Sequence, residues 1–306
     1  LEFRRVLFRS INQNFSFAAL WSPVFIGFTI VMIGIYFAVI GPLRPRFRGA
    51  APVPIHKKIF FVAGLLVFYL GFGGPLYLIG HLMFSSHMTQ MALVYFVAPP
   101  LILLGLPEWL LRPMAEKKWF SILTWPLFGI IFFNVGLSVY HFPFVFDFLM
   151  SHYELHICYQ GVLFVGSLIT WWQILTPVPE LKQLSELKKI GYIFANSMLL
   201  LPACALIIFT NTPVYATYTD PNAWQYALGL CLPAGEAVPP ELYESLGLLS
   251  TLQDQQLGGI IMKMTQEFTY FGALGHIFYH WIKREKANSP APEEYQLQKT
   301  AEKPSV

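Results

Sequence analysis

Residues 80–100 read GHLMFSSHMTQMALVYFVAPP, a segment that begins with polar side chains and runs into an apolar stretch ending in two prolines. If it is helical from about Leu82, Met83, His87 and Met91 fall four apart and share one face. Thioether and imidazole groups together suit soft or borderline metals, Cu(I) above all. The alternative is that the methionines fill gaps between packed helices while the histidines cap a helix end.

This segment lies within residues 59–107, which contain no Asp, Glu, Lys or Arg. Such a run accommodates two membrane helices of about 20 residues each. Charged residues make up 12% of the chain, against about 25% in soluble domains. We therefore expect an integral membrane protein embedded in the lipid bilayer. The net charge of +3 gives no reason to expect nucleic acid binding, and the three separated cysteines predict no disulfide framework.

The apolar segments predict an all-α fold, a bundle of seven transmembrane helices. The seventh segment is the weakest because Lys263 and Glu267 interrupt it. The expected spans are roughly 20–40, 58–79, 83–105, 119–140, 153–175, 190–211 and 254–282.

Basic residues concentrate in the first, third and fifth loops and after the last span, and the other loops lack them. Because basic loops stay cytoplasmic, the N-terminus is expected outside and the C-terminus in the cytoplasm. Only the prefix LEFRRVLFRS disagrees, so we interpret the segment 1–19 as carrying a foreign prefix. Residues 20–286 are the expected membrane domain, 211–253 its external loop, a lid or small cap, and 287–306 a disordered cytoplasmic tail.

This topology places five of the eight histidines at the outer membrane face. His152 and His156 are four apart in HYELH, so both rings could point at one ion from a single helix. Asp254 begins the seventh span on the same side, as a ligand or as a partner that orients one. Alternatively, the histidines bond to backbone or headgroups at the interface. The predicted main metal ligands are His87, His152 and His156, with His81, His141, Met83, Met88, Met91 and Asp254 as further candidates.

The seventh span carries polar side chains at depth, namely Gln255, Gln256, Lys263, Gln266 and Glu267. A charged residue near the centre of a membrane helix costs about 2.5–3.5 kcal/mol on insertion scales. A helix can pair Lys263 with Glu267, so we interpret them as an ion pair that locks this helix into the bundle. The alternative is that they line a transport pathway. No Ser-His-Asp order, phosphate loop or paired-carboxylate pattern is present, so an enzyme is not expected.

Five sequence blocks in one order carry a resemblance to a known family. They are GHLMFSSHMTQM, VAPPLILLGLPEW, the pair Trp171–Trp172, LPACALIIF and DQQLGGIIMK. Together they resemble the CtaG family of caa3-type cytochrome c oxidase assembly factors, from about Trp21 to Trp281. The resemblance implies a seven-span bacterial plasma-membrane protein that is needed to form an active haem-copper oxidase and is not itself an oxidase subunit. Gln160 and Met91 stand where the resemblance implies further histidines.

The resemblance also implies functional positions. The family's polar blocks fall on His81, Ser85, His87, Met88 and Gln90, and on Asp254, Gln255, Gln256, Gly258, Gly259, Met262 and Lys263. We expect an assembly factor that holds or passes copper at the outer face, toward cytochrome c oxidase subunits as its partners. One alternative is a metal-free scaffold that binds oxidase subunits through its spans and external loop. Another is a transporter of copper or a small solute.

Overall fold

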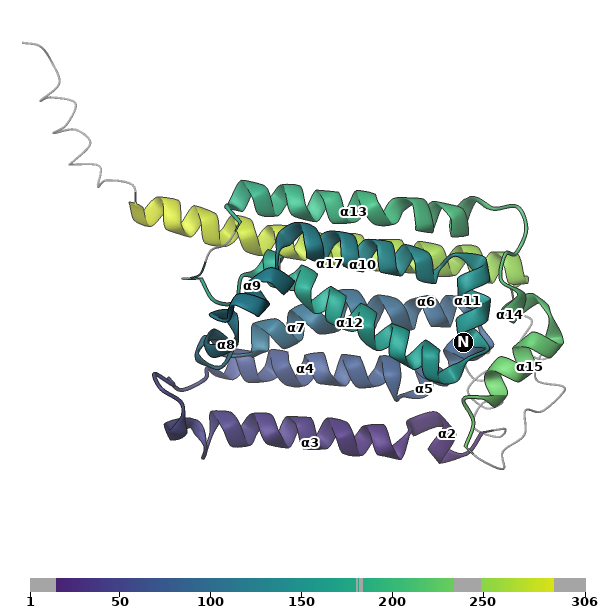
Figure 1. Cartoon of the computed structure of the whole chain (residues 1–306), viewed down its shortest axis with the longest axis horizontal. Helices are drawn as coiled ribbons and strands as arrows, with labels where there is room; N and C mark the ends of the chain where they lie inside the picture. The colour runs from purple at the N-terminus through teal and green to yellow at the C-terminus, as the bar shows by residue number, and fades with distance from the viewer. Residues whose placement is uncertain (1–14, 180, 182–183, 234–248, 289–306) are drawn as a thin grey trace, which may run out of the picture.

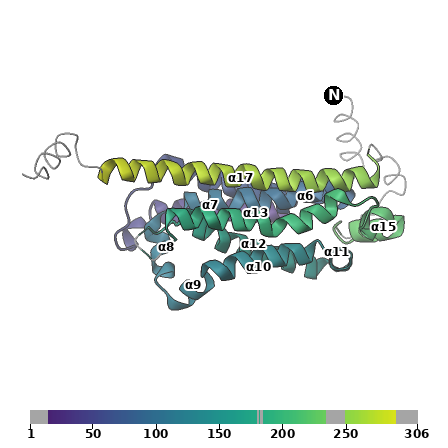
Figure 2. The same ribbon diagram turned by 90° about the horizontal axis from the view of Figure 1, so that it is seen from above.

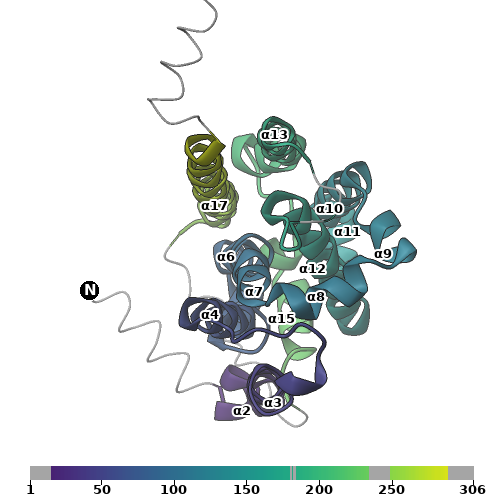
Figure 3. The same ribbon diagram turned by 90° about the vertical axis from the view of Figure 1, so that its left-hand side faces the viewer.

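A computed structural model describes residues 15–179, 181, 184–233 and 249–288. Within these ranges all regular secondary structure is helical, and the long helices lie side by side along one direction (Figure 1). Figure 3 shows the same bundle from one end. The predicted foreign prefix lies outside the described residues, and so does the predicted C-terminal tail except for residues 287 and 288, which are the last two of α17.

The bundle consists of long helices, several of them interrupted by short breaks. In chain order they are α2 (Phe17–Trp21) with α3 (Pro23–Ile40), α4 (Ile55–Phe72) with α5 (Pro75–Leu82), and α6 (Phe84–Ala92) with the π-helix η2 (Leu93–Val97) and α7 (Ala98–Gly105). They continue with α10 (Pro126–Tyr140), α12 (Tyr153–Leu175), α13 (Glu186–Phe209) and α17 (Thr251–Asn288). Short helices complete the described part: η1 (Arg44–Arg46), α8 (Glu108–Ala115), α9 (Lys118–Leu123), α11 (Pro143–Met150), α14 (Ala216–Thr219) and α15 (Pro221–Gly229).

Five helices in the described ranges are long and apolar enough to cross a membrane. They are Phe17–Ile40, Ile55–Leu82, Phe84–Gly105, Tyr153–Leu175 and Glu186–Phe209. The pair α10 and α11 would make a sixth, bent by 77°. Helix α17 has 38 residues and packs against α6 and α13. It is not among the five, because its polar residues make it less apolar than they are. The count of seven spans and the orientation of the termini stay predictions.

The fourth predicted span is not one continuous helix in the structure. Residues 119–140 were expected as one helix, whereas α9 ends at Leu123 and α10 begins at Pro126. Pro126 and Pro143 each stand in the first turn of a helix, the position where a missing N–H costs nothing. These prolines therefore start new helices, and the chain turns sharply after Tyr140.

A one-residue turn joins the second and third spans. Met83 is extended, with φ −138° and ψ 133°, between the end of α5 and the start of α6. The two helices fold back on each other so closely that a Cβ on Gly80 would lie 3.2 Å from the Cα of His87. A side chain at this position would press on the backbone of α6, so glycine favours this approach. The turn brings His81 and His87 to one end of the bundle.

The π-helix has its cause in the proline pair at residues 99 and 100. Pro99 has no N–H to donate to the carbonyl of Tyr95, four residues earlier. Two side chains of α12 donate to this oxygen instead, Ser167 Oγ at 2.5 Å and Trp171 Nε1 at 3.2 Å. These bonds tie α12 to the third span at membrane depth.

Helices α14 and α15 form a cap over one end of the bundle (Figure 1). Side chains of the cap bond to backbone carbonyls below them: Tyr215 Oη to His141, Tyr218 Oη to Gly80, and Trp224 Nε1 to Leu82, at 2.9, 2.6 and 3.3 Å. The described part of the predicted external loop therefore covers the end of the bundle where His81 and His87 lie. Within it, we call residues 214–230 the cap.

Candidate functional site

Directly beneath the cap lies a group of fully buried polar and sulfur-bearing side chains, which we call the histidine cluster. It consists of His81, His87, Met88, Tyr140, His141 and His156, each at most 1% exposed. The His156 ring lies 5.8 Å from that of His81 and 6.1 Å from that of His87, between ring centroids. Side chains from four separate helix segments, α5, α6, α10 with its C-terminal end, and α12, thus lie together in this cluster.

The Tyr140 hydroxyl lies between two imidazoles, 2.7 Å from His156 Nε2 and 3.1 Å from His87 Nε2. A phenol has one proton, so it donates to one ring and accepts an N–H from the other. If it donates to the closer His156, then His87 carries its proton on Nε2. His87 Nδ1 is then a bare lone pair, and this buried atom has no hydrogen-bond partner among the described residues.

A second contact joins His141 and Met88. His141 Nδ1 lies 2.8 Å from the carbonyl oxygen of Leu137, so this nitrogen donates and Nε2 is the unprotonated one in the neutral ring. His141 Nε2 lies 3.2 Å from Met88 Sδ. Two lone-pair atoms therefore face each other in a buried site, and neither has a proton to share.

Two neighbouring amide side chains extend the polar surroundings of the cluster. Gln160 Nε2 lies 3.7 Å from Met91 Sδ, so the two positions where the resemblance implies histidines contact each other. Gln90 is buried, and neither its amide oxygen nor its nitrogen has a partner among the described residues. His81 Nδ1 bonds to the carbonyl of Tyr77 at 3.0 Å, which fixes the orientation of its ring.

Two predicted ligands lie elsewhere. His152 is exposed, its Nδ1 bonds to the carbonyl of Phe148 at 2.7 Å, and its ring packs on that of Phe148. Helix α12 begins only at Tyr153, so His152 does not share a helical face with His156. Met83 sits at the turn before α6 and is likewise outside the helical stripe expected for it with His87.

Asp254 is nearly buried, at 7% exposure, and caps the first turn of α6. Its carboxylate accepts from the backbone N–H groups of Phe84 at 2.7 Å and Ser85 at 3.3 Å, and from the Ser85 hydroxyl. A negative charge is favourable at a helix N-terminus. The structure thus commits the Asp254 oxygens to α6, next to the turn that presents His87.

The remaining polar residues of α17 connect it to α13 and the cap. Gln255 accepts from the N–H of Val214 at 2.8 Å and donates to the carbonyl of Ile207 at 3.2 Å. Gln256 Nε2 donates to the carbonyl of Thr210 at 3.2 Å. The glutamine pair therefore anchors the segment between α13 and the cap.

Lys263 and Glu267 form the expected ion pair, with Nζ and Oε1 2.6 Å apart. Lys263 also donates to the Ser197 carbonyl and to Gln266 Oε1, at 3.1 and 3.0 Å. Gln266 in turn donates to the carbonyl of Asn196 at 3.4 Å. This network locks α17 onto the middle of α13.

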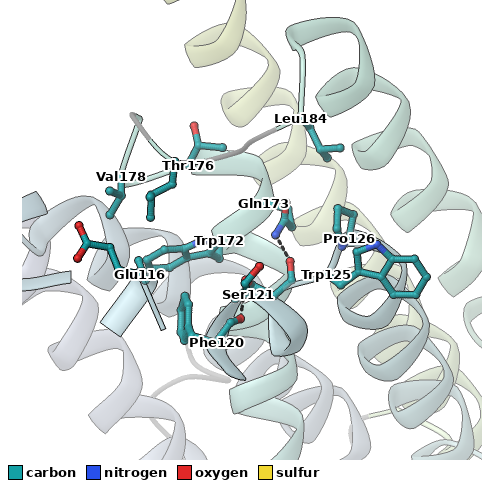
Figure 4. A pocket seen from close by; sticks show the side chains of 13 residues that line it. Glu116, Phe120, Ser121, Trp125, Pro126, Trp172, Gln173, Thr176, Val178 and Leu184 are labelled. Carbon is teal, nitrogen blue, oxygen red and sulfur yellow. Dashed lines mark hydrogen bonds between the residues drawn. The ribbon is translucent and has the colours of Figure 1, made fainter. Parts of the chain in front are cut away.

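At the opposite end of the bundle lies a cavity of about 450 Å³ between α9 and the end of α12 (Figure 4). Two of its polar side chains have partners: Gln173 Nε2 donates to the carbonyl of Thr124, and Thr176 accepts from Lys189. These bonds close the helix ends, and nothing in this lining points to a ligand.

The family comparison decides what kind of protein this is. Residues 34–284 match the family described as cytochrome c oxidase caa3 assembly factor. The chain belongs to this family. No curated protein and no solved structure shows a significant match to it.

The matched range of this caa3 assembly factor contains the whole histidine cluster and the Lys263–Glu267 pair. Three of its sequence blocks meet in the fold. The block at residues 80–91 forms the hairpin of α5 and α6, the block that begins at Asp254 caps it, and Trp171 bonds to the third span. The blocks thus lie together around the site, although they are far apart in the sequence.

In the described ranges no group of three or more His, Cys, Asp or Glu side chains is arranged to hold a metal ion. Thioether sulfur is a further type of metal ligand that the described residues place beside imidazoles. Met88 is the methionine placed for this, because its sulfur contacts His141. The sequence singled out both residues but not Tyr140, for which it gave no signal.

Proposed function

We propose that this caa3 oxidase assembly factor holds Cu(I) in the histidine cluster, at the outer face of the bacterial plasma membrane, and passes it toward copper-containing oxidase subunits. The observation that carries the proposal is the 3.2 Å distance between His141 Nε2 and Met88 Sδ. An unprotonated imidazole nitrogen and a thioether repel each other weakly at this range. A soft cation between them turns both lone pairs into ligands.

The distance is compatible with a shared ion. With metal bonds of about 2.0 Å to nitrogen and 2.3 Å to sulfur, the two donors of a tetrahedral site lie about 3.5 Å apart. The observed 3.2 Å is slightly shorter, so a small rotation of the Met88 thioether would suffice. Methionine has the torsional freedom for such an adjustment.

Further ligands are available from the neighbouring imidazoles. His87 and His156 both direct Nε2 toward the Tyr140 hydroxyl, so a displaced phenol would leave two nitrogens facing one point. Soft thioether and borderline imidazole donors favour Cu(I) over hard cations. Since the cluster is fully buried, the bound ion would be shielded from water, and loading would require movement of the cap.

A metal-free scaffold for oxidase subunits is the second candidate. It is favoured by the lack of three grouped His, Cys, Asp or Glu side chains among the described residues. In this case the Tyr140 bonds to His87 and His156 serve to hold α6, α10 and α12 together.

Titration of the purified protein with Cu(I) against a competing chelator separates these candidates. We expect about one ion per chain, with the affinity reduced at least about tenfold by Met88→Leu or His141→Ala, as for perturbed metal sites. His152→Ala is the matched control, because this histidine is exposed and lies outside the cluster. If the wild type and the three variants bind Cu(I) equally, or if none of them binds it, the result favours the metal-free scaffold.

A further inference from the structure

Helix α17 lies at the edge of the bundle (Figures 2 and 3). One side of it packs on α6 and α13. Its other side has no partner among the described residues and presents apolar side chains three or four positions apart. They include Ile260, Met264, Phe268 and Phe271, each at least 46% exposed. We call this side the outer face of α17.

Glu267 lies at the border of this outer face. Its side chain is 45% exposed, whereas that of its partner Lys263 is 17% exposed and turned toward α13. Oε1 of Glu267 receives both bonds, from Lys263 Nζ and from the Ser197 hydroxyl. Oε2 has no hydrogen bond within the described part of the chain, so the carboxylate keeps an acceptor directed away from this pairing.

Because α13 is one of the candidate membrane spans, the Glu267 carboxylate bonded to it is expected at the depth of the bilayer centre. Its partner Ser197 is halfway along α13, which runs from Glu186 to Phe209. At this depth there is no water to satisfy an exposed acceptor, and polar side chains are expensive there. The middle of other exposed helices is apolar, as at Val31 of α3 and Ile131 of α10. The outer face of α17 therefore differs from an ordinary lipid-facing surface.

We propose that the outer face of α17 docks a membrane-spanning helix of another protein, and that this helix carries a hydrogen-bond donor at the bilayer centre opposite Glu267. Charge complementarity selects this occupant. A basic, hydroxyl or amide side chain would satisfy the free carboxylate oxygen, and an apolar stripe on the same helix would cover Met264 and Phe271. Interhelical hydrogen bonds of this kind stabilise helix association in membranes.

Other occupants fit less well. A second copy of this chain, related by a two-fold axis along the membrane normal, would bring one Glu267 toward the other. A wholly apolar helix or lipid would leave the acceptor unsatisfied. The docking surface does not depend on copper, because Glu267 belongs to the α13–α17 network and not to the histidine cluster.

Site-specific photo-cross-linking in cells that make the full-length protein tests this inference. A photoreactive residue replaces Phe271 on the outer face, and Ile131 on α10, which is also exposed, provides the control position. We expect an adduct from position 271 that is absent from position 131. Peptide sequencing should place the cross-link in a span of another membrane protein that has a donor side chain at matching depth.

The role of the carboxylate is tested in the same experiment. Glu267→Leu should lower the adduct yield about three- to tenfold, the range expected for an interhelical hydrogen bond, while Glu267→Gln, which keeps an acceptor, should lower it less. Substituting the partner's donor by Leu should have the same effect as Glu267→Leu and no further effect in the double variant. This partner-side change also serves if Glu267→Leu fails to fold.

Several outcomes would overturn the inference: equal adducts from both positions, adducts only with a second copy, a cross-linked span without a donor, or a yield unaffected by Glu267→Leu. Cu(I) titration of Glu267→Leu gives an independent reading of the histidine cluster. Unchanged copper binding with lost adduct separates the docking surface from the copper proposal.

Discussion

Replacing Asp254 tests whether this residue serves the helix or the metal. Asp254→Ala removes the acceptor for the N–H groups of Phe84 and Ser85 and for the Ser85 hydroxyl. Two buried backbone donors then lose their partner, at about 1–3 kcal/mol each, and the favourable charge at the N-terminus of α6 is lost, at about 0.3–1 kcal/mol. The expected loss of stability is about 2–7 kcal/mol.

Asp254→Asn should behave differently, because asparagine caps helices about as well as aspartate. It keeps one acceptor oxygen and loses the charge, so the expected cost is about 1 kcal/mol. In thermal denaturation of the detergent-solubilised protein, Asp254→Ala should lower Tm on the order of 10 °C, and Asp254→Asn by a few degrees.

Cu(I) titration of the Asn variant completes this test. A capping residue predicts affinity within about twofold of the wild type, because the imidazole and thioether donors are untouched. The reasoning is refuted if Asp254→Ala is as stable as the wild type. It is also refuted if Asp254→Asn is stable but loses copper, since the carboxylate would then be a ligand.

The structure also predicts how two further substitutions and a rise in pH change the stability of the protein. Ser167→Ala removes one of two donors to the Tyr95 carbonyl and should cost about 0.6–2 kcal/mol in thermal denaturation; an unchanged Tm would contradict this account of the π-helix. Lys263→Met leaves Glu267 unpaired, so it should be less stable than the double variant that also replaces Glu267 by Leu; the reverse order would argue against the pair. Burial raises the pKa of Tyr218 in the cap well above 10.0, so the cap loses stability as pH rises above about 10, where the detached tyrosine ionises first. Tryptophan fluorescence of the cap should report this release, and Tyr218→Phe should weaken its pH dependence.

The positions of most spans could be predicted because bilayer thickness sets the length of an apolar run. The predicted segment 153–175 coincides with α12, and 83–105 differs by one residue from Phe84–Gly105. The fourth span was predicted as straight because hydropathy ignores backbone geometry. Pro126 and Pro143, each in a first helical turn, were the available signal for its broken course.

The site was predictable only as far as topology gathers residues at one membrane face. That argument correctly brought His81, His87, His141 and His156 to one end of the bundle. His152 lies at the same end, but the four-residue spacing did not place its ring beside His156, because α12 begins only at Tyr153 and the ring packs on Phe148. Tyr140, which bridges two rings, carries no pattern in the sequence, since its partners lie on other helices.

X-ray absorption spectroscopy of the Cu(I)-loaded protein tests the central claim most directly. A copper ion shared by Met88 and His141 predicts a sulfur neighbour at about 2.3 Å together with imidazole nitrogens at about 2.0 Å. The sulfur signal should disappear in Met88→Leu and persist in His152→Ala. A spectrum without sulfur, or one that Met88→Leu leaves unchanged, would contradict the account.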